Sequence, residues 1–296
     1  MSIFHCQAKA ISRASGRSAT AAAAYRAGER IIDERTGEVH DYRRKKGVLH
    51  SQIYVPQGVR MMSRSALWNL AEKAEKRKDA KVAREWELAL PAELSRINRM
   101  YLAHHFARAI VERYGVAVDM CIHAPGKKGD DRNHHVHVLT TTRVLRRDGF
   151  GEKTRVLDSP RTSGEEVTAV RKIWEQLCNR ALELDMLPER VDSRSLKAQG
   201  INREPTRHLG PIATAIERRG RRSFRGDEHR RGHESRTARE LAVLQKIEGG
   251  IEAAKQRHAQ RKRQAELEAK RVQREKEAER VAAIQQRNTK RKGMQR

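Results

Sequence analysis

One segment constrains the fold more than any other part of the 296-residue chain: IHAPGKKGDDRNHHVHVLTTTR. Side chains two apart on a strand share a face, so His135 and His137 project together while the intervening valine turns into the core. If the preceding loop turns near Gly129, His123 at the end of the previous strand lies opposite His135. The segment therefore predicts an antiparallel hairpin that carries three convergent imidazoles.

Hydrophobic patterning extends this hairpin into a larger sheet. Five strands are predicted, at Ile3–Lys9, His50–Val55, Arg84–Leu90, Val116–His123 and His135–Thr142. Helical periodicity predicts helices at Ser18–Ile32, Ser65–Lys76, Leu94–Tyr114 and Gly164–Asp185, with a polar loop at Asp33–Gly47. We expect an α+β protein in which helices cover one face of an antiparallel, about five-stranded sheet.

The chain is strongly basic. It contains 64 Lys and Arg against 38 Asp and Glu, a net charge of +26. Such an imbalance attracts polyanions through counterion release, so nucleic acid is the leading partner. A basic housekeeping protein such as a ribosomal component has the same balance, and charge alone does not separate the two.

Cysteine usage and hydropathy indicate a cytoplasmic protein. The 3 cysteines lack CxxC spacing and two lie in strand-like apolar stretches, as expected in a reducing compartment. No apolar run approaches the roughly twenty residues that a bilayer span requires, and the N-terminus does not resemble a signal peptide. We expect no membrane insertion.

The C-terminal part differs from the rest. Residues 221–296 contain 23 Lys and Arg against 11 Asp and Glu, a net charge of +12, and only one aromatic residue. From about residue 236 the apolar residues are sparse, and no heptad is sustained, which favours a solvated basic tail over a coiled coil. The expected domains are residues 1–220 and a charged, helical or partly disordered tail at 221–296.

The three histidines predict a metal site. A lone His-x-His is more often a surface pair, but three imidazoles in register above an apolar face favour metal binding. Three protein ligands leave coordination positions open, which suits catalysis by a divalent ion more than a structural role. Strand parity points His134 to the opposite face, so it is not included.

The segment SATAAAAYRAGER offers a nucleophile. Ser18 is a good helix N-cap, and the alanines leave Tyr25 free of bulky neighbours. Nearby Arg17, Arg26 and Arg30 would attract phosphate. The competing interpretation is an alanine-rich helix whose one aromatic residue simply packs on the sheet.

The strand REWELALP presents two carboxylates, Glu85 and Glu87, opposite its apolar face. Either could orient a histidine ligand or accept the proton of a tyrosine, which is a weak nucleophile until it is deprotonated. A carboxylate pair that merely balances nearby arginines is the alternative.

Four separated features together resemble the MobA/MobL relaxases, over about residues 1–220. They are the Ala-rich helix with Tyr25, the strand REWELALP, the His-Val-His strand followed by LTTTR, and the segment RSLKAQGINREPTRHLGP. Within the wider group of HUH endonucleases, the resemblance implies that His135 and His137 are the signature pair, His123 the third ligand and Tyr25 the nucleophile. Arg143 of LTTTR joins the arginines expected to bind DNA. Family members commonly have proline where this chain has His134.

The resemblance implies a plasmid mobilisation enzyme. Such an enzyme nicks one strand at a transfer origin by transesterification, with Mg²⁺ or Mn²⁺, and keeps the 5′ end as a phosphotyrosine. It would bind single-stranded and duplex DNA at the origin, an accessory mobilisation protein and a secretion-system coupling protein, and could travel with the transferred strand.

Three alternatives remain. A rolling-circle initiator or transposase would use the same residue types, but there the histidine pair typically precedes the tyrosine, whereas here Tyr25 precedes His135. A non-catalytic DNA-binding accessory protein with a metal-stabilised fold would bind without cleaving. The chain could also be a truncated piece of a longer relaxase.

Overall fold

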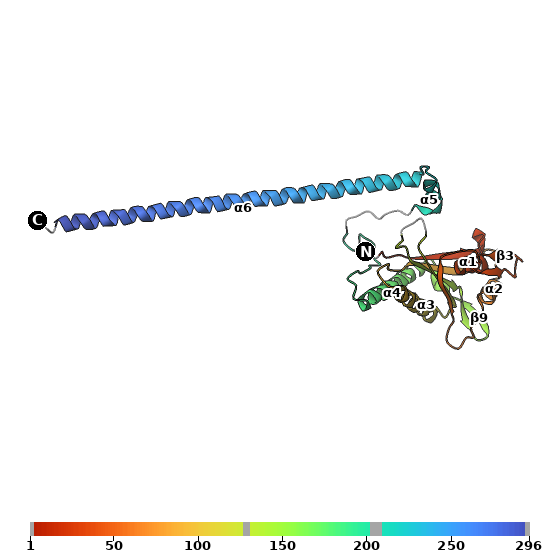
Figure 1. Cartoon of the computed structure of the whole chain (residues 1–296). Coiled ribbons are helices and arrows are strands. Elements are labelled where there is room, and N and C mark those ends of the chain that lie inside the picture. Colours follow the sequence, from red (N-terminus) through yellow and green to blue (C-terminus); the bar gives the residue numbers. More distant parts are fainter. Residues whose placement is uncertain (1–2, 127–130, 202–208, 294–296) are drawn as a thin grey trace. The chain divides into compact units, whose positions relative to one another are not determined.

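The computed structural model describes residues 3–126, 131–201 and 209–293, with side chains up to residue 277 except at residue 211. Two compact units are present, Met1–Gln199 and Gly200–Arg296 (Figure 1). Helix α5 (Gly210–Arg218), which the sequence analysis placed in the first domain, packs with α6 in the second unit. The division of the chain at residue 220 stays a prediction.

The first unit is built on a five-stranded sheet in which every neighbouring pair is antiparallel, in the order β1-β5-β7-β6-β4. This confirms the α+β fold class and places a strand in each predicted segment. The strands are β1 (Cys6–Ser12), β4 (Val48–Tyr54), β5 (Lys81–Ala89), β6 (Val118–His123) and β7 (His135–Thr141).

The two central strands have the register that the histidine pattern requires. His123 on β6 pairs with His135 on β7, and Cys121 pairs with His137. The predicted turn near Gly129 lies outside the described residues. The pairing itself confirms that the imidazoles share one face of the sheet.

One face of the sheet is covered by α3 (Arg96–Tyr114) and α4 (Ser163–Leu184). Phe106 of α3 and Trp174 of α4 meet edge to face with centroids 5.2 Å apart. Both are fully buried against the apolar side chains of the three inner strands, among them Trp86, Leu88, Met120, Val136 and Val138.

The opposite face is covered by α1 (Ala19–Ala27) and α2 (Arg64–Ala74). Small residues of α1, together with Leu67 and Trp68 of α2, pack on Ile11, Ala83 and Leu139 of the strands. The expectation that helices cover one face was therefore wrong. Glu85, Glu87 and the three histidines also lie on this second face, so its apolar residues do not form a conspicuous pattern in the sequence.

Helix α1 ends earlier than predicted. Gly28 adopts a left-handed φ of 68° and its N–H caps the carbonyl of Ala24. Because glycine takes this conformation without steric cost, it stops the helix at Ala27. The residues that follow form a small hairpin, β2 (Arg30–Ile32) with β3 (Val39–Asp41), where the end of a helix and a polar loop were expected.

A second hairpin was not predicted at all. It consists of β8 (Arg143–Arg146) and β9 (Gly149–Lys153), directly after the central strand β7. Two short 3-10 helices, η1 (Arg13–Ser15) and η2 (Arg155–Leu157), complete the first unit.

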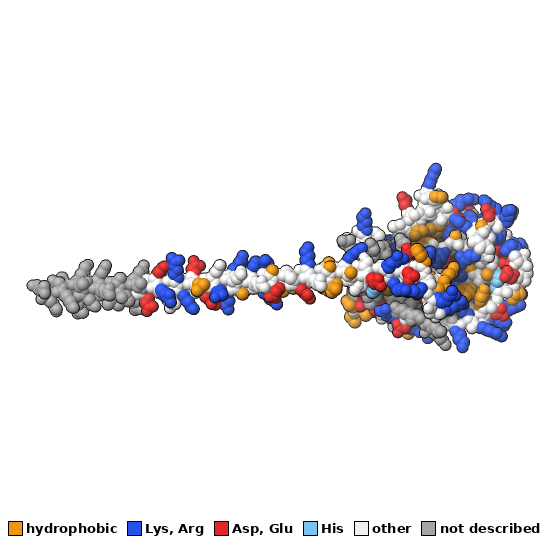
Figure 2. Space-filling view, turned by 90° about the horizontal axis from the view of Figure 1, so that it is seen from above, with side chains coloured by type: hydrophobic (Ala, Val, Ile, Leu, Met, Phe, Trp, Pro, Cys, Tyr) orange, Lys and Arg blue, Asp and Glu red, His pale blue; other side chains and the backbone are white. Residues whose placement is uncertain are grey.

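The charged tail is a single helix, α6 (Phe224–Gly293), as the sequence predicted. Its described side chains mix Lys and Arg with Asp and Glu, and Lys and Arg are also scattered over the face of the compact part that Figure 2 shows. Among the described residues, no helix is both long and apolar enough to cross a membrane.

The packing of α3 on the sheet gives a stability prediction. Phe106→Ala should lower the free energy of unfolding by about 3 to 5 kcal/mol, because it opens a cavity in a fully buried site. Tyr101→Ala on the same helix removes an aromatic side chain that is 56% exposed, so the free energy of unfolding should change by less than about 0.5 kcal/mol. Urea unfolding followed by circular dichroism measures both. Equal losses would contradict the described core.

Candidate active site

Three histidines converge on the α1 side of the sheet. His123 ends β6, while His135 and His137 begin β7, and one ligand nitrogen from each lies within 4.8 Å of the other two. Their ring centroids are 4.8 to 5.4 Å apart. Among the described residues, these three histidines form the one group of His, Cys, Asp or Glu side chains whose spacing could hold a metal ion. His134, on the opposite parity, is outside it.

Hydrogen bonds fix the orientation of all three rings. Nε2 of His123 contacts the carbonyl oxygen of Arg26 at 2.7 Å, and Nδ1 of His135 contacts that of Asn133 at 2.9 Å. Nδ1 of His137 contacts Oε1 of Glu85 at 2.6 Å. Each ring thus has one nitrogen engaged with an acceptor, which leaves the other nitrogen as an electron-pair donor for a metal.

Burial favours the neutral form that a metal ligand needs. It lowers the pKa of His123 to about 4, helped by the nearby charge of Lys45, although the bond to the Arg26 carbonyl opposes the shift. Burial also lowers the pKa of His135. Neutral, oriented imidazoles are a donor set that fits a divalent transition metal.

Glu85 lies between a metal-site histidine and the helix that carries Tyr25. Its carboxylate is almost completely buried, accepts from Nε of Arg26 at 2.5 Å and from Nη2 of the same residue, and contacts His137. Burial alone would raise its pKa, but the bonds from His137 and Arg26 outweigh it and hold the pKa well below its ordinary value. Glu85 is therefore a charged carboxylate that orients His137.

Glu87 occupies a different environment. Its carboxylate forms an ion pair with Lys9 of β1, and its side chain is partly exposed. Although Glu87 pairs with His137 in the strand register, no described hydrogen bond joins their side chains. Of the two carboxylates predicted on this strand, only Glu85 makes a described hydrogen bond to one of the three histidines.

Tyr25 stands near the end of α1 with half of its surface exposed. Ser18 caps the start of this helix through Ala21 N–H, as predicted. Lys45 holds the other end: its Nζ lies 3.7 Å from the centre of the Tyr25 ring and donates to the Tyr25 carbonyl at 2.8 Å. Tyr42 meets the ring edge-on. The aromatic ring is thus steadied without being buried.

A hollow of about 810 Å³ opens beside Tyr25. Arg17 lines it and is exposed, together with Lys76 and Lys78 from the segment that follows α2. The hollow also borders the β2–β3 hairpin through His40. It is therefore a basic recess that contains the exposed tyrosine.

The other three predicted DNA-binding arginines do not offer an exposed charge to the hollow, although Arg26 lines it. Arg26 is buried in its ion pair with Glu85 and in a bond to the Ala22 carbonyl. Arg143 pairs with Glu75 and donates to the Gly151 carbonyl. Arg30 is exposed on β2 but does not line the hollow.

Sequence reasoning missed Lys45 and two buried carboxylates, Glu72 of α2 and Glu75 just after it. Lys45 stands in a basic loop with no periodicity to single it out. Glu72 did leave a signal, because it follows Trp68 by four residues and so falls on the apolar face of the helix. A charged residue at such a position is buried only when it is paired.

Comparison with known proteins decides the family. The model of the MobA/MobL family matches residues 17–219, which include Tyr25, both carboxylates and all three histidines. The chain belongs to the MobA/MobL family. A relative named mobilization protein MobL, from Acidithiobacillus ferridurans, is 42% identical over 279 residues, covering 85% of this chain and 72% of the relative.

Other matches share very different fractions of their own length with this chain. A probable conjugal transfer protein TraA from Sinorhizobium fredii is 35% identical over 249 residues, which is 74% of this chain but 22% of that protein. A solved structure described as "Molecular Basis of Vancomycin Resistance Transfer in Staphylococcus aureus" is 31% identical with a TM-score of 0.58, and the match covers 65% of this chain and 99% of that one. The matching region is thus found in chains of very different length.

The contact between Glu85 and His137 predicts an effect on metal affinity. Glu85→Gln should weaken Mn²⁺ binding by about 10- to 100-fold, because it removes the charge that orients a ligand. Glu87→Gln loses the Lys9 ion pair and a charge that acts on His135 and His137 without a described hydrogen bond to either, so it should weaken binding less than Glu85→Gln does. Isothermal titration calorimetry, with folding checked by circular dichroism, measures both. If both variants lose affinity equally, the orienting role is wrong.

Proposed function

We propose that this protein is a mobilisation relaxase, an enzyme that nicks one DNA strand at a transfer origin and remains joined to it through Tyr25. One observation carries the proposal: the last turn of the tyrosine helix is bonded directly to the histidine cluster, through the Arg26 carbonyl to His123 and the Arg26 side chain to Glu85. The names of the relatives, which are mobilisation and conjugal transfer proteins, support it.

The proposed reaction is a transesterification. The Tyr25 oxygen attacks phosphorus, the bond from phosphorus to the 3′ oxygen breaks, and the strand keeps a 5′ phosphotyrosine. The departing 3′ oxygen takes a proton to become a hydroxyl. The tyrosine proton passes to water, because Tyr25 is half exposed and both nearby carboxylates are engaged with cations. No nucleotide is consumed, since one phosphodiester replaces another.

The surrounding residues have separate roles in this proposal. His123, His135 and His137 would hold a divalent ion, which when bound supplies Lewis-acid stabilisation of charge on the scissile phosphate. Glu85 orients His137, and Arg26 fixes the tyrosine helix instead of binding phosphate. Three imidazoles favour a first-row transition ion over Mg²⁺, which prefers oxygen ligands, so of the two expected ions we propose Mn²⁺.

The basic hollow would receive the single strand beside the scissile phosphate. Arg17, Lys76 and Lys78 line it, are exposed and have no ion pair among the described residues, so their charges are available to phosphates. Arg30 and Arg143 are less suited to bind the strand, because Arg30 lies outside the hollow and Arg143 is paired with Glu75.

We assign nicking to residues 1–220 and a supporting role to residues 221–296. The tail helix would add salt-sensitive affinity for duplex DNA through its net charge of +12, the difference between 23 cationic and 11 anionic residues. An accessory mobilisation protein and a coupling protein are the proposed protein partners.

Covalent attachment tests the function. With Mn²⁺ and a labelled single strand of the cognate origin, the unchanged protein should form an adduct that survives denaturing electrophoresis. Tyr25→Phe should abolish the adduct because the attacking oxygen is gone, and His135→Ala should reduce it by at least about 100-fold. Tyr101→Phe, at another exposed tyrosine, should not change it.

The alternatives give different results in the same experiment. Tight binding without any adduct would support a metal-stabilised, non-catalytic DNA-binding protein. An adduct that persists in Tyr25→Phe and disappears when another tyrosine is replaced would move the nucleophile elsewhere, as in an initiator-type arrangement.

The hollow predicts a particular salt dependence. Replacing Arg17, Lys76 and Lys78 together by Gln should lower the slope of log affinity for single-stranded DNA against log salt by about 0.7 for each phosphate that is no longer neutralised, or about 2 in total. Fluorescence anisotropy over about 50 to 300 mM KCl measures the slope. The control removes the same charge from three cations outside the hollow that are also exposed and without an ion pair among the described residues: Arg147, Arg161 and Lys197. Equal slopes in both triple variants would show that the strand does not use the hollow.

A further inference from the structure

We propose that Glu72 of α2 is a positioning residue for the nucleophile, acting by capping the helix that carries Tyr25. The inference rests on the proposed function and adds a residue to it. Oε1 of Glu72 accepts a hydrogen bond from the backbone N–H of Ala19 at 2.6 Å. Ala19 is the first residue of α1, so a side chain from a different helix completes the cap that Ser18 begins.

The second carboxylate oxygen of Glu72 is held by Arg13. Nε of Arg13 donates to Oε2 at 3.0 Å and Nη2 donates at 2.5 Å, while its remaining donors bind the main-chain carbonyls of Glu72, Glu75 and Arg77. Arg13 thereby fixes the carboxylate against the end of α2. The side chains of Glu72 and Arg13 are 1% and 9% exposed, so their geometry is set by the protein and not by water.

Helix α1 needs such an anchor. It has only 9 residues, and those before Tyr25 are all alanine or threonine, so a helix this short is marginal on its own in water. Its first four N–H groups have no partner within the helix. A buried carboxylate at Ala19 satisfies one of them and also interacts favourably with the positive end of the helix dipole.

The anchor acts on the position of the nucleophile because α1 is short. Its C-terminal turn is tied to the histidine site through Arg26, and its N-terminal turn is tied to α2 through Glu72. Tyr25 lies between these two ties with its ring half exposed, so burial of its own side chain does little to fix its height along the helix axis. Loss of the N-terminal tie would let the helix shift or fray, and the tyrosine oxygen would move with it.

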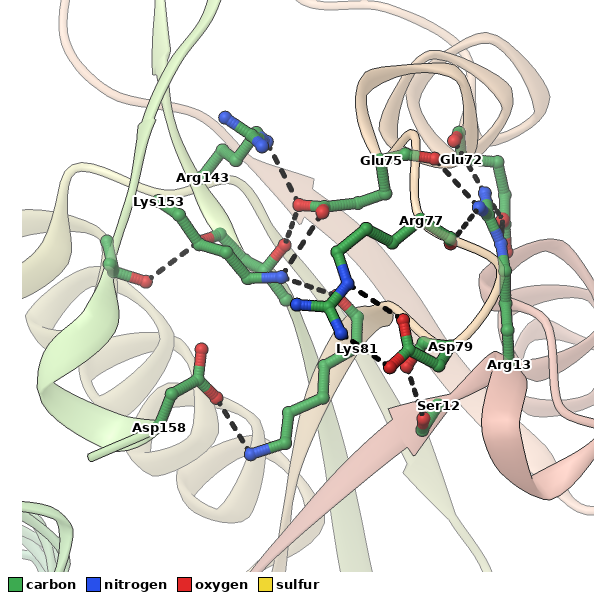
Figure 3. Close-up of polar contacts among 12 residues, drawn as sticks. Ser12, Arg13, Glu72, Glu75, Arg77, Asp79, Lys81, Arg143, Lys153 and Asp158 are labelled. Atoms are coloured by element: carbon green, nitrogen blue, oxygen red, sulfur yellow. Dashed lines mark hydrogen bonds and ion pairs between the residues drawn. The ribbon is translucent and has the colours of Figure 1, made fainter. Parts of the chain in front are cut away.

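Glu75 provides a matched comparison at the end of the same helix. It is also buried and paired, but Figure 3 shows its carboxylate directed away from Arg13, toward Arg143 and Lys153. It also accepts from Thr142 Oγ1 at 3.0 Å. Glu75 therefore shares the burial and charge of Glu72 but holds the β8–β9 hairpin and not α1.

The test separates the cap from the ion pair. Arg13→Met/Glu72→Gln removes both charges but keeps an acceptor for Ala19 N–H, whereas Arg13→Met/Glu72→Met has a similar shape without the acceptor. At saturating single-stranded DNA and Mn²⁺, the rate of adduct formation should be about 100-fold lower in the Met variant than in the Gln variant, the scale expected for a displacement of about 1 Å. The affinities for Mn²⁺ and DNA should agree within about twofold between the two variants, because both retain the histidines and the exposed cations Arg17, Lys76 and Lys78, and both lack Arg13, which also lines the hollow.

A second readout does not depend on nicking. Hydrogen exchange over residues 18–28, measured on the full chain without DNA, should be faster in the Met variant than in the Gln variant, and unchanged in Glu75→Met. If the Met variant does not fold, Glu72→Asp replaces it, because this shorter carboxylate can still pair with Arg13 but does not reach Ala19 N–H. Glu75→Asp is then its control.

The outcomes are distinct. Equal adduct rates and equal exchange in the Gln and Met variants would overturn the positioning role and leave Glu72 as a purely structural ion pair. Absence of an adduct in the unchanged protein would overturn the proposed function instead, and exchange over residues 18–28 would still show whether Glu72 fixes α1.

Discussion

The buried ion pair between Arg26 and Glu85 is the interaction on which the rest of the site depends. Arg26 comes from the tyrosine helix and Glu85 from the inner strand β5, and the same carboxylate contacts His137. Because two charges are desolvated together, removing either one leaves the other unpaired, at a typical cost of about 3 to 5 kcal/mol. The backbone of Arg26 adds a second link through His123. One residue therefore couples the nucleophile to two of the three histidines.

The close approach of α1 to the sheet explains why the helix is rich in alanine. A helix that packs close to a sheet and to α2 needs small side chains, and Ala22, Ala23 and Ala24 are all buried there. Small side chains bury little apolar area, so they stabilise the helix weakly. Directional polar contacts at its two ends then determine where it sits. The composition that keeps Tyr25 unobstructed is the same composition that makes its position depend on Arg26 and Glu72.

The sheet and its histidines could be predicted because their pattern is local. Alternating or continuous apolar segments identified all five strands, a turn assumed near Gly129 placed His123 opposite His135, and strand parity excluded His134. The end of α1 could not be predicted in the same way, because alanines and Arg26 continue to favour a helix until Gly28 turns the chain. The helical cover of the second face was missed because polar site residues interrupt its apolar pattern.

Side-chain partners were harder to predict than positions. Glu85 and Glu87 have the same parity on one strand, yet their neighbours differ because β1 supplies Lys9 to one while α1 supplies Arg26 to the other. Arg26 was expected to bind phosphate because it follows Tyr25 directly in the sequence. That position does not reveal which side of the helix faces the sheet. These assignments depend on contacts between elements that are 59 to 78 residues apart.

The net charge of the chain likewise does not reveal which cations meet DNA. Arg13, Arg26, Arg64 and Arg84 all have side chains less than one-tenth exposed and are paired with carboxylates inside the first unit. Such arginines contribute to the formal charge of +26 but release no counterions when a strand binds, because their partners already neutralise them. Arg17 and the two lysines of the hollow are different, since they are exposed and no described carboxylate pairs with them. The buried arginines therefore fix the elements that form the site, and the exposed cations of the hollow are left to attract the strand.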